Sequence, residues 1–211
     1  QVQFMYADMP TSRTGSFTKT HIAIATALRG CSAADGYASQ AFTDFLNNIP
    51  VIASRYQAEY AGTQYPSSGF LAGSPLAGAE FDPQVGSVST TSSDVLIPAF
   101  LAAYSGTDPR KIALTAFPSL SAIMPNWRVT YDGLMQIGWF KNLFKSFTIT
   151  HAYQCTYSVG SYSSYLNWVG VDGDFGFTLN EQTGNPIPSS PYNISSVAIT
   201  EKFAPLFGIN A

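Results

Sequence analysis

Residues 146–161 have the sequence SFTITHAYQCTYSVGS, in which two kinds of side chain alternate almost without interruption. The odd positions from Phe147 to Val159 are mainly apolar or aromatic, and the even positions are mainly small or hydroxyl-bearing. Successive side chains of a strand point to opposite faces, so the pattern predicts a strand with one apolar and one polar face. At about 3.4 Å per residue it would span roughly 50 Å, which exceeds the ~30 Å hydrocarbon core of a bilayer. The stretch therefore predicts a strand of a transmembrane β-barrel.

The composition of the chain is compatible with this class. Only 11% of the 211 residues are charged, against about 25% in typical soluble domains, and 14% are aromatic. Outer-membrane barrels have an apolar lipid-facing band flanked by aromatic girdles. The net charge of −3, with Lys and Arg scattered singly, argues against nucleic-acid binding. No apolar stretch approaches the ~20 residues of a membrane-spanning helix.

Residue periodicity predicts the other elements. Alternation predicts further strands over 2–6, 16–29, 49–60, 126–132 and 194–207. Helical spacing predicts helices over 39–46, 93–105 and 138–145. Segments rich in Gly, Ser or Pro predict loops over 62–92 and 171–190. We expect an all-β fold in which residues 1–211 belong to one transmembrane antiparallel β-barrel domain, with long loops and short helical insertions. Because the chain begins at Gln1 without an initiator Met, we also expect it to be a piece of a longer protein.

Alternation also assigns side chains to the two faces. The apolar positions are expected to face lipid: Ile52, Tyr56, Phe147, Ile149, Tyr153, Tyr157, Val159, Val197, Ile199 and Phe203. The polar positions are expected to face a hydrated pore: Arg55, Gln57, Glu59, Thr148, Thr150, Gln154 and Thr156. Charged side chains are costly toward lipid, which supports the second assignment. His151 is an exception, because it falls on the apolar face.

The sequence contains no recognisable catalytic constellation. His21 and His151 each stand alone in a predicted strand, so we expect neither an enzyme nor a cofactor. Asp172-Gly173-Asp174 resembles part of a calcium loop but lacks the distal Glu, so no metal site is expected. Cys31 and Cys155 could form a disulfide only in an oxidising compartment, and we favour two small, nearly apolar side chains.

Two stretches carry a more specific resemblance. They are DVLIPAFLAAY at 94–104, followed by Gly106 and Asp108-Pro109, and PNWRVTYDGL at 125–134, which leads into the long strand. Together they resemble the C-terminal part of the SprA/Sov family, the outer-membrane translocon of the type IX secretion system. Shorter matches follow in family order, including MPTS at 9–12, FLNN at 45–48 and YNISSV at 192–197.

The resemblance implies a very large single-chain barrel in the cell outer membrane, whose water-filled pore passes folded cargo proteins. The chain would then be one sector of the wall of this protein-conducting channel, which serves protein secretion and gliding motility. The implied partners are a PorV-type outer-membrane barrel, a periplasmic plug protein and other type IX secretion subunits, besides membrane lipid.

Two other classes remain open. A secreted or cell-surface β-sandwich that binds glycan or protein explains the composition and the alternation about as well, but it explains the strand length less well. Another kind of barrel, such as a TonB-dependent transporter, is weaker because its plug and TonB-box features are absent.

Overall fold

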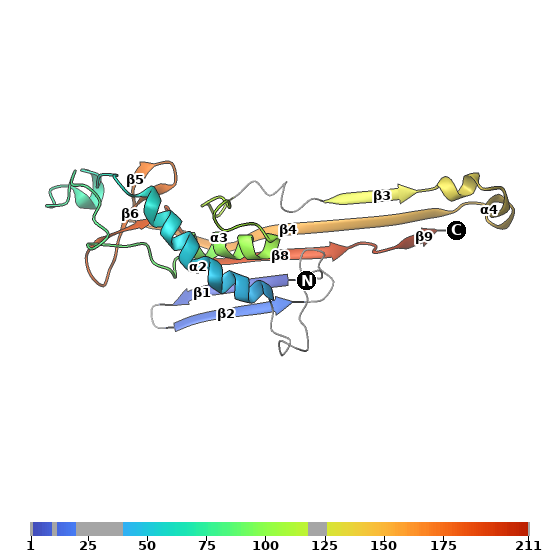
Figure 1. Ribbon diagram of the computed structural model, residues 1–211, viewed down its shortest axis with the longest axis horizontal. Coiled ribbons are helices and arrows are strands. Elements are labelled where there is room, and N and C mark those ends of the chain that lie inside the picture. Colours follow the sequence, from blue (N-terminus) through green and yellow to red (C-terminus); the bar gives the residue numbers. More distant parts are fainter. Residues whose placement is uncertain (1, 10–11, 20–39, 118–125, 211) are drawn as a thin grey trace.

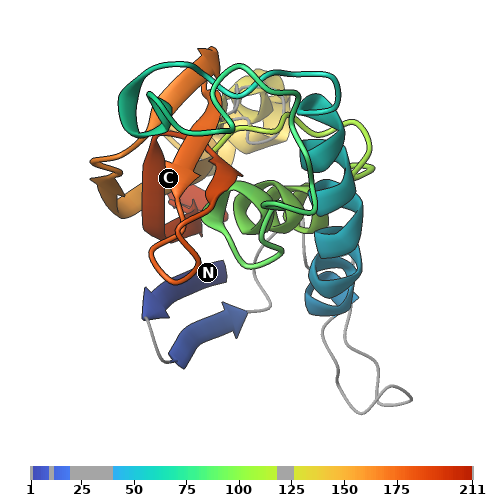
Figure 2. The same ribbon diagram turned by 90° about the vertical axis from the view of Figure 1, so that its left-hand side faces the viewer.

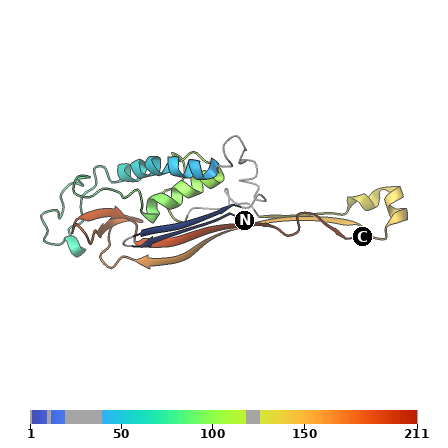
Figure 3. The same ribbon diagram turned by 90° about the horizontal axis from the view of Figure 1, so that it is seen from below.

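A long antiparallel sheet runs through the molecule, and one end of it projects from the rest (Figure 1). The computed structural model describes residues 2–9, 12–19, 40–117 and 126–210. Helices lie against one face of the sheet over part of its length only, and the remainder forms a thin extension that ends in a helical tip (Figure 3). The molecule therefore has a layered end and a single-layer end.

The sheet is built on β4 (Thr148–Ser164), with β3 (Trp127–Tyr131) on one edge and β8 (Tyr192–Phe203) on the other. The short β9 (Gly208–Asn210) follows β8 and pairs with the start of β4. The predicted strands over 126–132, 146–161 and 194–207 are thus confirmed. The 17 residues of β4 extend over about 55 Å at the usual rise per residue.

The register of the sheet brings the apolar side chains to one face. Trp127 and Phe203 both pair with Tyr153, and Tyr131 and Ile209 both pair with Ile149. Directly paired residues of antiparallel strands have their side chains on the same face. The predicted alternation therefore holds across the four strands as far as Val159, beyond which the register between β4 and β8 shifts.

A second pair of strands lies near the N-terminus. β1 (Val2–Met9) and β2 (Ser12–Lys19) form an antiparallel hairpin, and β1 lies alongside β8 (Figure 1). The strand predicted over 2–6 is confirmed. The strand predicted over 16–29 overlaps β2, and its remaining part, with His21 and the following Cys31, lies outside the described residues.

The prediction of a loop over 171–190 was wrong, because three short strands form there. β5 (Val169–Asp172), β6 (Phe175–Leu179) and β7 (Pro186–Ser189) make a separate antiparallel sheet. The fully buried side chain of Phe177 anchors β6. The prolines that favoured a loop lie on β7, an edge strand, where a missing N–H is tolerated.

The prediction of a strand over 49–60 was also wrong, because the helix α2 (Gln40–Glu59) continues through these residues. The helix predicted over 39–46 is confirmed as its first part. Phe45, Ile52 and Tyr56 are spaced by seven and four residues, so they share one helix face, and all three are buried. Packing of this face, rather than alternation, determines the structure of the segment.

α3 (Ser93–Ser105) occupies the residues for which a helix was predicted. It is buried from Val95 to Tyr104 on all sides, as an apolar helix without a polar face must be. It ends at Gly106, whose left-handed φ of 72° suits a glycine. Pro98 lies inside the helix, beyond its first turn.

Seen end-on, α3 lies between α2 and the main sheet (Figure 2). The segment 62–92 wraps the layered end, and its regular structure is limited to η2 (Gly69–Leu71) and an isolated bridge between Gln64 and Glu80. It is nonetheless packed, since Tyr65 and Phe81 contact the ring of Phe177 at centroid distances of 4.9 and 5.7 Å.

The tip of the projecting end consists of η4 (Gly133–Gln136) and α4 (Gly138–Leu143). The helix predicted over 138–145 is therefore confirmed. The described chain is mostly antiparallel strand with few helices, which agrees with the expected all-β class.

The burial of α3 in the layered end predicts that two leucine-to-alanine substitutions differ greatly in their effect on the free energy of unfolding. Leu101→Ala in α3 removes a side chain that is 0% exposed, whereas Leu166→Ala removes one that is 99% exposed. We expect Leu101→Ala to lower the free energy of unfolding by about 2–5 kcal/mol and Leu166→Ala to change it by less than about 0.5 kcal/mol. Denaturant titration measures both, and equal effects would contradict the burial of α3.

Candidate functional site

The apolar face of the main sheet is divided into a covered half and a bare half. In the covered half, Tyr153, Cys155, Val197 and Ile199 are buried in the same core as the side chains of α3. The hydroxyl of Tyr104, on α3, lies 3.9 Å from the sulfur of Cys155. The chain itself therefore supplies the cover that the layered end requires.

This cover corrects several lipid-facing predictions. Tyr153, Val197 and Ile199 are buried by other parts of the chain and cannot contact lipid along their length. Tyr157 and Val159 are half-buried and packed against the same core, and the Tyr157 hydroxyl donates to the carbonyl of Ala116 at 3.0 Å. Cys155 is a free, buried thiol, in line with its reading as a small apolar side chain.

The bare half begins beyond Tyr153, toward the tip. Val129 is 54% exposed and Ile209 is 67% exposed, although both are apolar and lie on the same face as the core. Phe147 and Ile149 of the predicted lipid-facing set lie here and are half-buried. From Phe147 to Tyr153 this half extends over roughly 20 Å at the rise of a strand.

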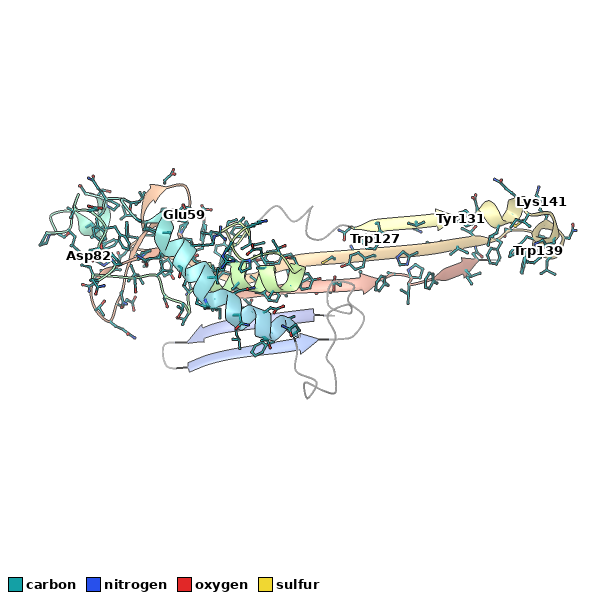
Figure 4. The ribbon with its side chains drawn as sticks, viewed as in Figure 1. Glu59, Asp82, Trp127, Tyr131, Trp139 and Lys141 are labelled. Carbon is teal, nitrogen blue, oxygen red and sulfur yellow. The ribbon has the colours of Figure 1, made fainter. Side chains whose placement is uncertain are left out.

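Aromatic side chains gather at both ends of the bare half (Figure 4). Near the helices, Trp127 stacks on Tyr153 with ring centroids 4.4 Å apart, and Phe203 lies 5.3 Å from Tyr153 on the other edge. At the tip, Phe140 and Phe144 lie 5.0 and 5.3 Å from Phe147. The stretch between these two groups carries Val129, Ile149 and Ile209, and also the ring of Tyr131, which pairs with Ile149 and is 52% exposed.

His151, the exception on the apolar face, is accommodated locally. Its Nδ1 lies 2.6 Å from the carbonyl oxygen of Leu206, which accepts the hydrogen bond. Its ring lies 5.6 Å from that of Phe203 and 6.2 Å from that of Trp127. The hydrogen-bonded imidazole therefore sits among the first group of rings.

Glu201 is a second polar exception, which alternation did not single out. It pairs with Cys155 on the covered half and is 6% exposed. The Tyr153 hydroxyl donates to one carboxylate oxygen, and the other oxygen has no hydrogen-bond partner among the described residues. A buried carboxylate is costly. Glu201 lies at the end of the covered half that is nearest the bare half.

The opposite face of the main sheet is polar. Gln154 and Thr156 of the predicted pore-facing set are exposed there, and Thr148 and Thr150 are half-buried. Gln154 pairs with the exposed Lys202 of β8. This face carries hydroxyl, amide and a few charged groups.

The pore-facing prediction was wrong for Arg55, Gln57 and Glu59, which lie on α2 instead of a strand. Arg55 donates to the carbonyls of Pro109 and Ile112 at 2.6 and 2.9 Å. The side-chain oxygen of Gln57 accepts the N–H of Val88 at 3.0 Å, whereas Glu59 is exposed at the end of the helix (Figure 4). Two of the three therefore connect α2 to neighbouring loops.

On the same helix, Ile52 and Tyr56 were predicted to face lipid but are buried in the core.

A small cavity of about 50 Å³ lies beside Asp94, at the start of α3. Its lining includes Tyr56, Phe117 and Asp174. One carboxylate oxygen of Asp94 accepts the N–H of Ser190 at 3.0 Å. This volume can hold water, but it is far below the ~300 Å³ at which small-molecule pockets begin.

Burial raises the pKa of Asp94 above its ordinary value, and the nearby Asp174 charge acts in the same direction. The hydrogen bonds from Ser190 lower this pKa and only partly offset the effect of burial. The fold therefore favours the neutral carboxyl at this position.

Comparison with known proteins gives no assignment: no family model and no curated protein matches the chain. Within the described ranges, no helix has both the length and the apolar character needed to cross a membrane. The same residues contain no group of three or more His, Cys, Asp or Glu arranged to hold a metal ion.

The raised pKa of Asp94 predicts a pH-dependent stability. The stabilising neutral form is fully populated below the ordinary pKa of 3.8 and is lost as the pH rises through the raised value. Asp94→Asn keeps an acceptor for Ser190 but removes the titration. We expect its melting temperature to fall less than that of the unchanged protein between pH 4 and pH 7, measured by thermal unfolding.

Asp172→Asn, at an exposed carboxylate, is the matched control and should leave the pH profile unchanged. Parallel profiles for Asp94→Asn and the unchanged protein would contradict the effect of burial on Asp94.

Proposed function

We propose that the chain is a wall segment of a very large outer-membrane β-barrel that exports folded cargo proteins through the type IX secretion system, as the resemblance to the SprA/Sov family implies. The observation that carries the proposal is the divided apolar face of the main sheet. One half is covered by the chain's own helices, the other half is bare and lined by aromatic rings, and the reverse face is mainly polar.

The bare half would cover part of the height of a membrane band. Transmembrane barrels have an outward apolar band about 25 Å tall with aromatic girdles at both interfaces. The bare stretch from Phe147 to Tyr153 runs for roughly 20 Å along the strand. At the usual tilt of about 40° it would span about 15 Å of that band, with Trp127 at one end and the rings of the tip at the other. Val129 and Ile209 lie between these ends and would contact acyl chains.

The covered half would then stand outside the bilayer. Beyond Tyr153 the strands continue for more than ten residues, and α3 replaces lipid as the cover of their apolar face. Glu201 supports this division, because its carboxylate would be far more costly in the hydrocarbon region than under α3.

The polar face would line the pore. A conduit for folded proteins needs a hydrated wall that adheres weakly, and the exposed Gln154 and Thr156 provide hydrogen bonding without a strong field. A PorV-type barrel, a periplasmic plug protein and other subunits of the secretion system are the partners that this proposal brings with it.

The second candidate is a secreted or cell-surface module that binds glycan or protein through its bare aromatic rings. The exposed Tyr131 and Val129 favour such a contact surface. The layer over the apolar face is helical, however, whereas the β-sandwich alternative requires a second sheet there. Purification as a soluble monomer without detergent would support this candidate against the barrel.

Neighbouring positions of β3 distinguish lipid from water. Val129→Arg places a charge on the bare apolar face, and Thr130→Arg places the same charge on the polar face, at a residue that is also exposed. In the bilayer we expect Val129→Arg to cost about 2–4 kcal/mol and Thr130→Arg less than about 0.5 kcal/mol. The amount of protease-resistant full-length protein in the outer-membrane fraction measures the difference.

In a water-exposed module both substitutions lie on the surface and should be tolerated equally. Equal recovery of the two variants, or a greater loss for Thr130→Arg, would contradict the assignment of the faces.

The conduit role predicts contact between the polar face and cargo. With a benzophenone amino acid in place of Gln154, illumination during secretion should link exported cargo to the full-length protein. The same amino acid in place of Val129, on the opposite face, should not capture cargo. Immunoblotting for the adduct measures both, and cargo adducts at Val129 alone would reverse the proposed orientation of the sheet.

A further inference from the structure

The tip, residues 133–147, exposes several large apolar side chains. Trp139 is 63% exposed and Leu143 is 68% exposed, and Ile137 is exposed as well. The ring of Trp139 lies 4.5 Å from that of Phe140, which joins it to the ring group formed with Phe144 and Phe147. The tip therefore presents indole and aliphatic side chains from a packed aromatic base.

The charge of the tip is mainly positive. Residues 133–147 contain Lys141 and Lys145 and no Asp or Glu, and the exposed Asp132 immediately precedes them, in a chain whose net charge is −3. Both lysines are exposed. Figure 4 shows Lys141 and Trp139 at the far end of the molecule, on opposite sides of the tip. Positive charge next to exposed apolar side chains complements an anionic surface with an apolar interior.

The position of the tip fits such a surface. The tip continues the bare apolar face directly, since Phe147 immediately precedes β4. It lies roughly 20 Å along the strand from Tyr153, at the far end of the bare half. Tryptophan is enriched where the band meets the headgroups, and lysine side chains extend from there to the phosphates.

We propose that the tip is a membrane-interface anchor that binds anionic phospholipid headgroups through Lys141 and Lys145 while Trp139 and Leu143 enter the headgroup boundary. This inference rests on the proposed wall function and deepens it, because it assigns one end of the band to a phospholipid leaflet. Barrels have short periplasmic turns and longer extracellular loops. The connection between β3 and β4 is shorter than that between β4 and β8, which places the tip on the periplasmic side.

Lipid photocrosslinking of the full-length protein tests the anchor. A benzophenone amino acid replaces Trp139, Leu143, Val129 or Leu166 one at a time, and the protein is reconstituted in vesicles of phosphatidylethanolamine and phosphatidylglycerol at about 3:1. Mass spectrometry identifies the lipid adducts. We expect adducts at Trp139 and Leu143 that are enriched in phosphatidylglycerol over its share of the vesicle, and none at Leu166.

Charge reversal tests the role of the lysines. Lys141→Glu with Lys145→Glu should lower the ratio of phosphatidylglycerol to phosphatidylethanolamine adducts at Leu143 by at least about fivefold, the effect of one lysine at a membrane surface. Lys202→Glu, at an exposed lysine on the polar face of the sheet, should leave it unchanged. An absence of enrichment, or the same enrichment in the doubly reversed variant, would overturn the anchor.

The benzophenone amino acid at Val129, in β3, distinguishes failure of the anchor from failure of the proposed wall function. Adducts at Val129 without adducts at Trp139 or Leu143 overturn the anchor and leave the wall function standing. Adducts at the tip without adducts at Val129 support lipid binding by the tip and overturn the wall function.

Discussion

The apolar face of β4 is longer than the cover that the described chain provides, and the other features of the structure follow from this constraint. Side chains on one face must be removed from water over the whole length of the strand. α3, which is apolar on every side, covers the half that bears Cys155, Val197 and Ile199, and α2 in turn covers α3. Nothing among the described residues covers Val129 or Ile209. A bilayer is the environment that completes this arrangement in the account proposed above.

The polar exceptions on the apolar face lie close to the boundary between the halves. Glu201 is buried next to Tyr153, and His151, two residues along β4, donates to a backbone carbonyl among aromatic rings. Neither group suits the middle of a hydrocarbon layer. Their positions therefore restrict how far the membrane band can extend toward the helices, which length alone leaves undetermined.

Sequence periodicity predicted the strands of the main sheet well and the faces of that sheet only in part. Alternation identifies a face as apolar, but it does not distinguish a face covered by lipid from one covered by the chain's own helices. Val197 and Ile199 were misassigned for that reason. The second half of α2 was missed because Ile52 and Tyr56 satisfy both a two-residue and a four-residue repeat, and only the packing against α3 separates them. Glu201 could have been noticed as the one acidic residue on the apolar face of the predicted last strand.

The central claim is that the sheet enters the membrane only over its bare half. A density map of the full-length protein in lipid nanodiscs tests it most directly, because the lipid belt and the helices are both visible in such a map. The account predicts that the belt surrounds the stretch from Phe147 to Tyr153, that Val129 and Ile209 face lipid, and that α2 and α3 stand outside the belt. A belt centred on Tyr157, or Val129 facing solvent, would contradict it.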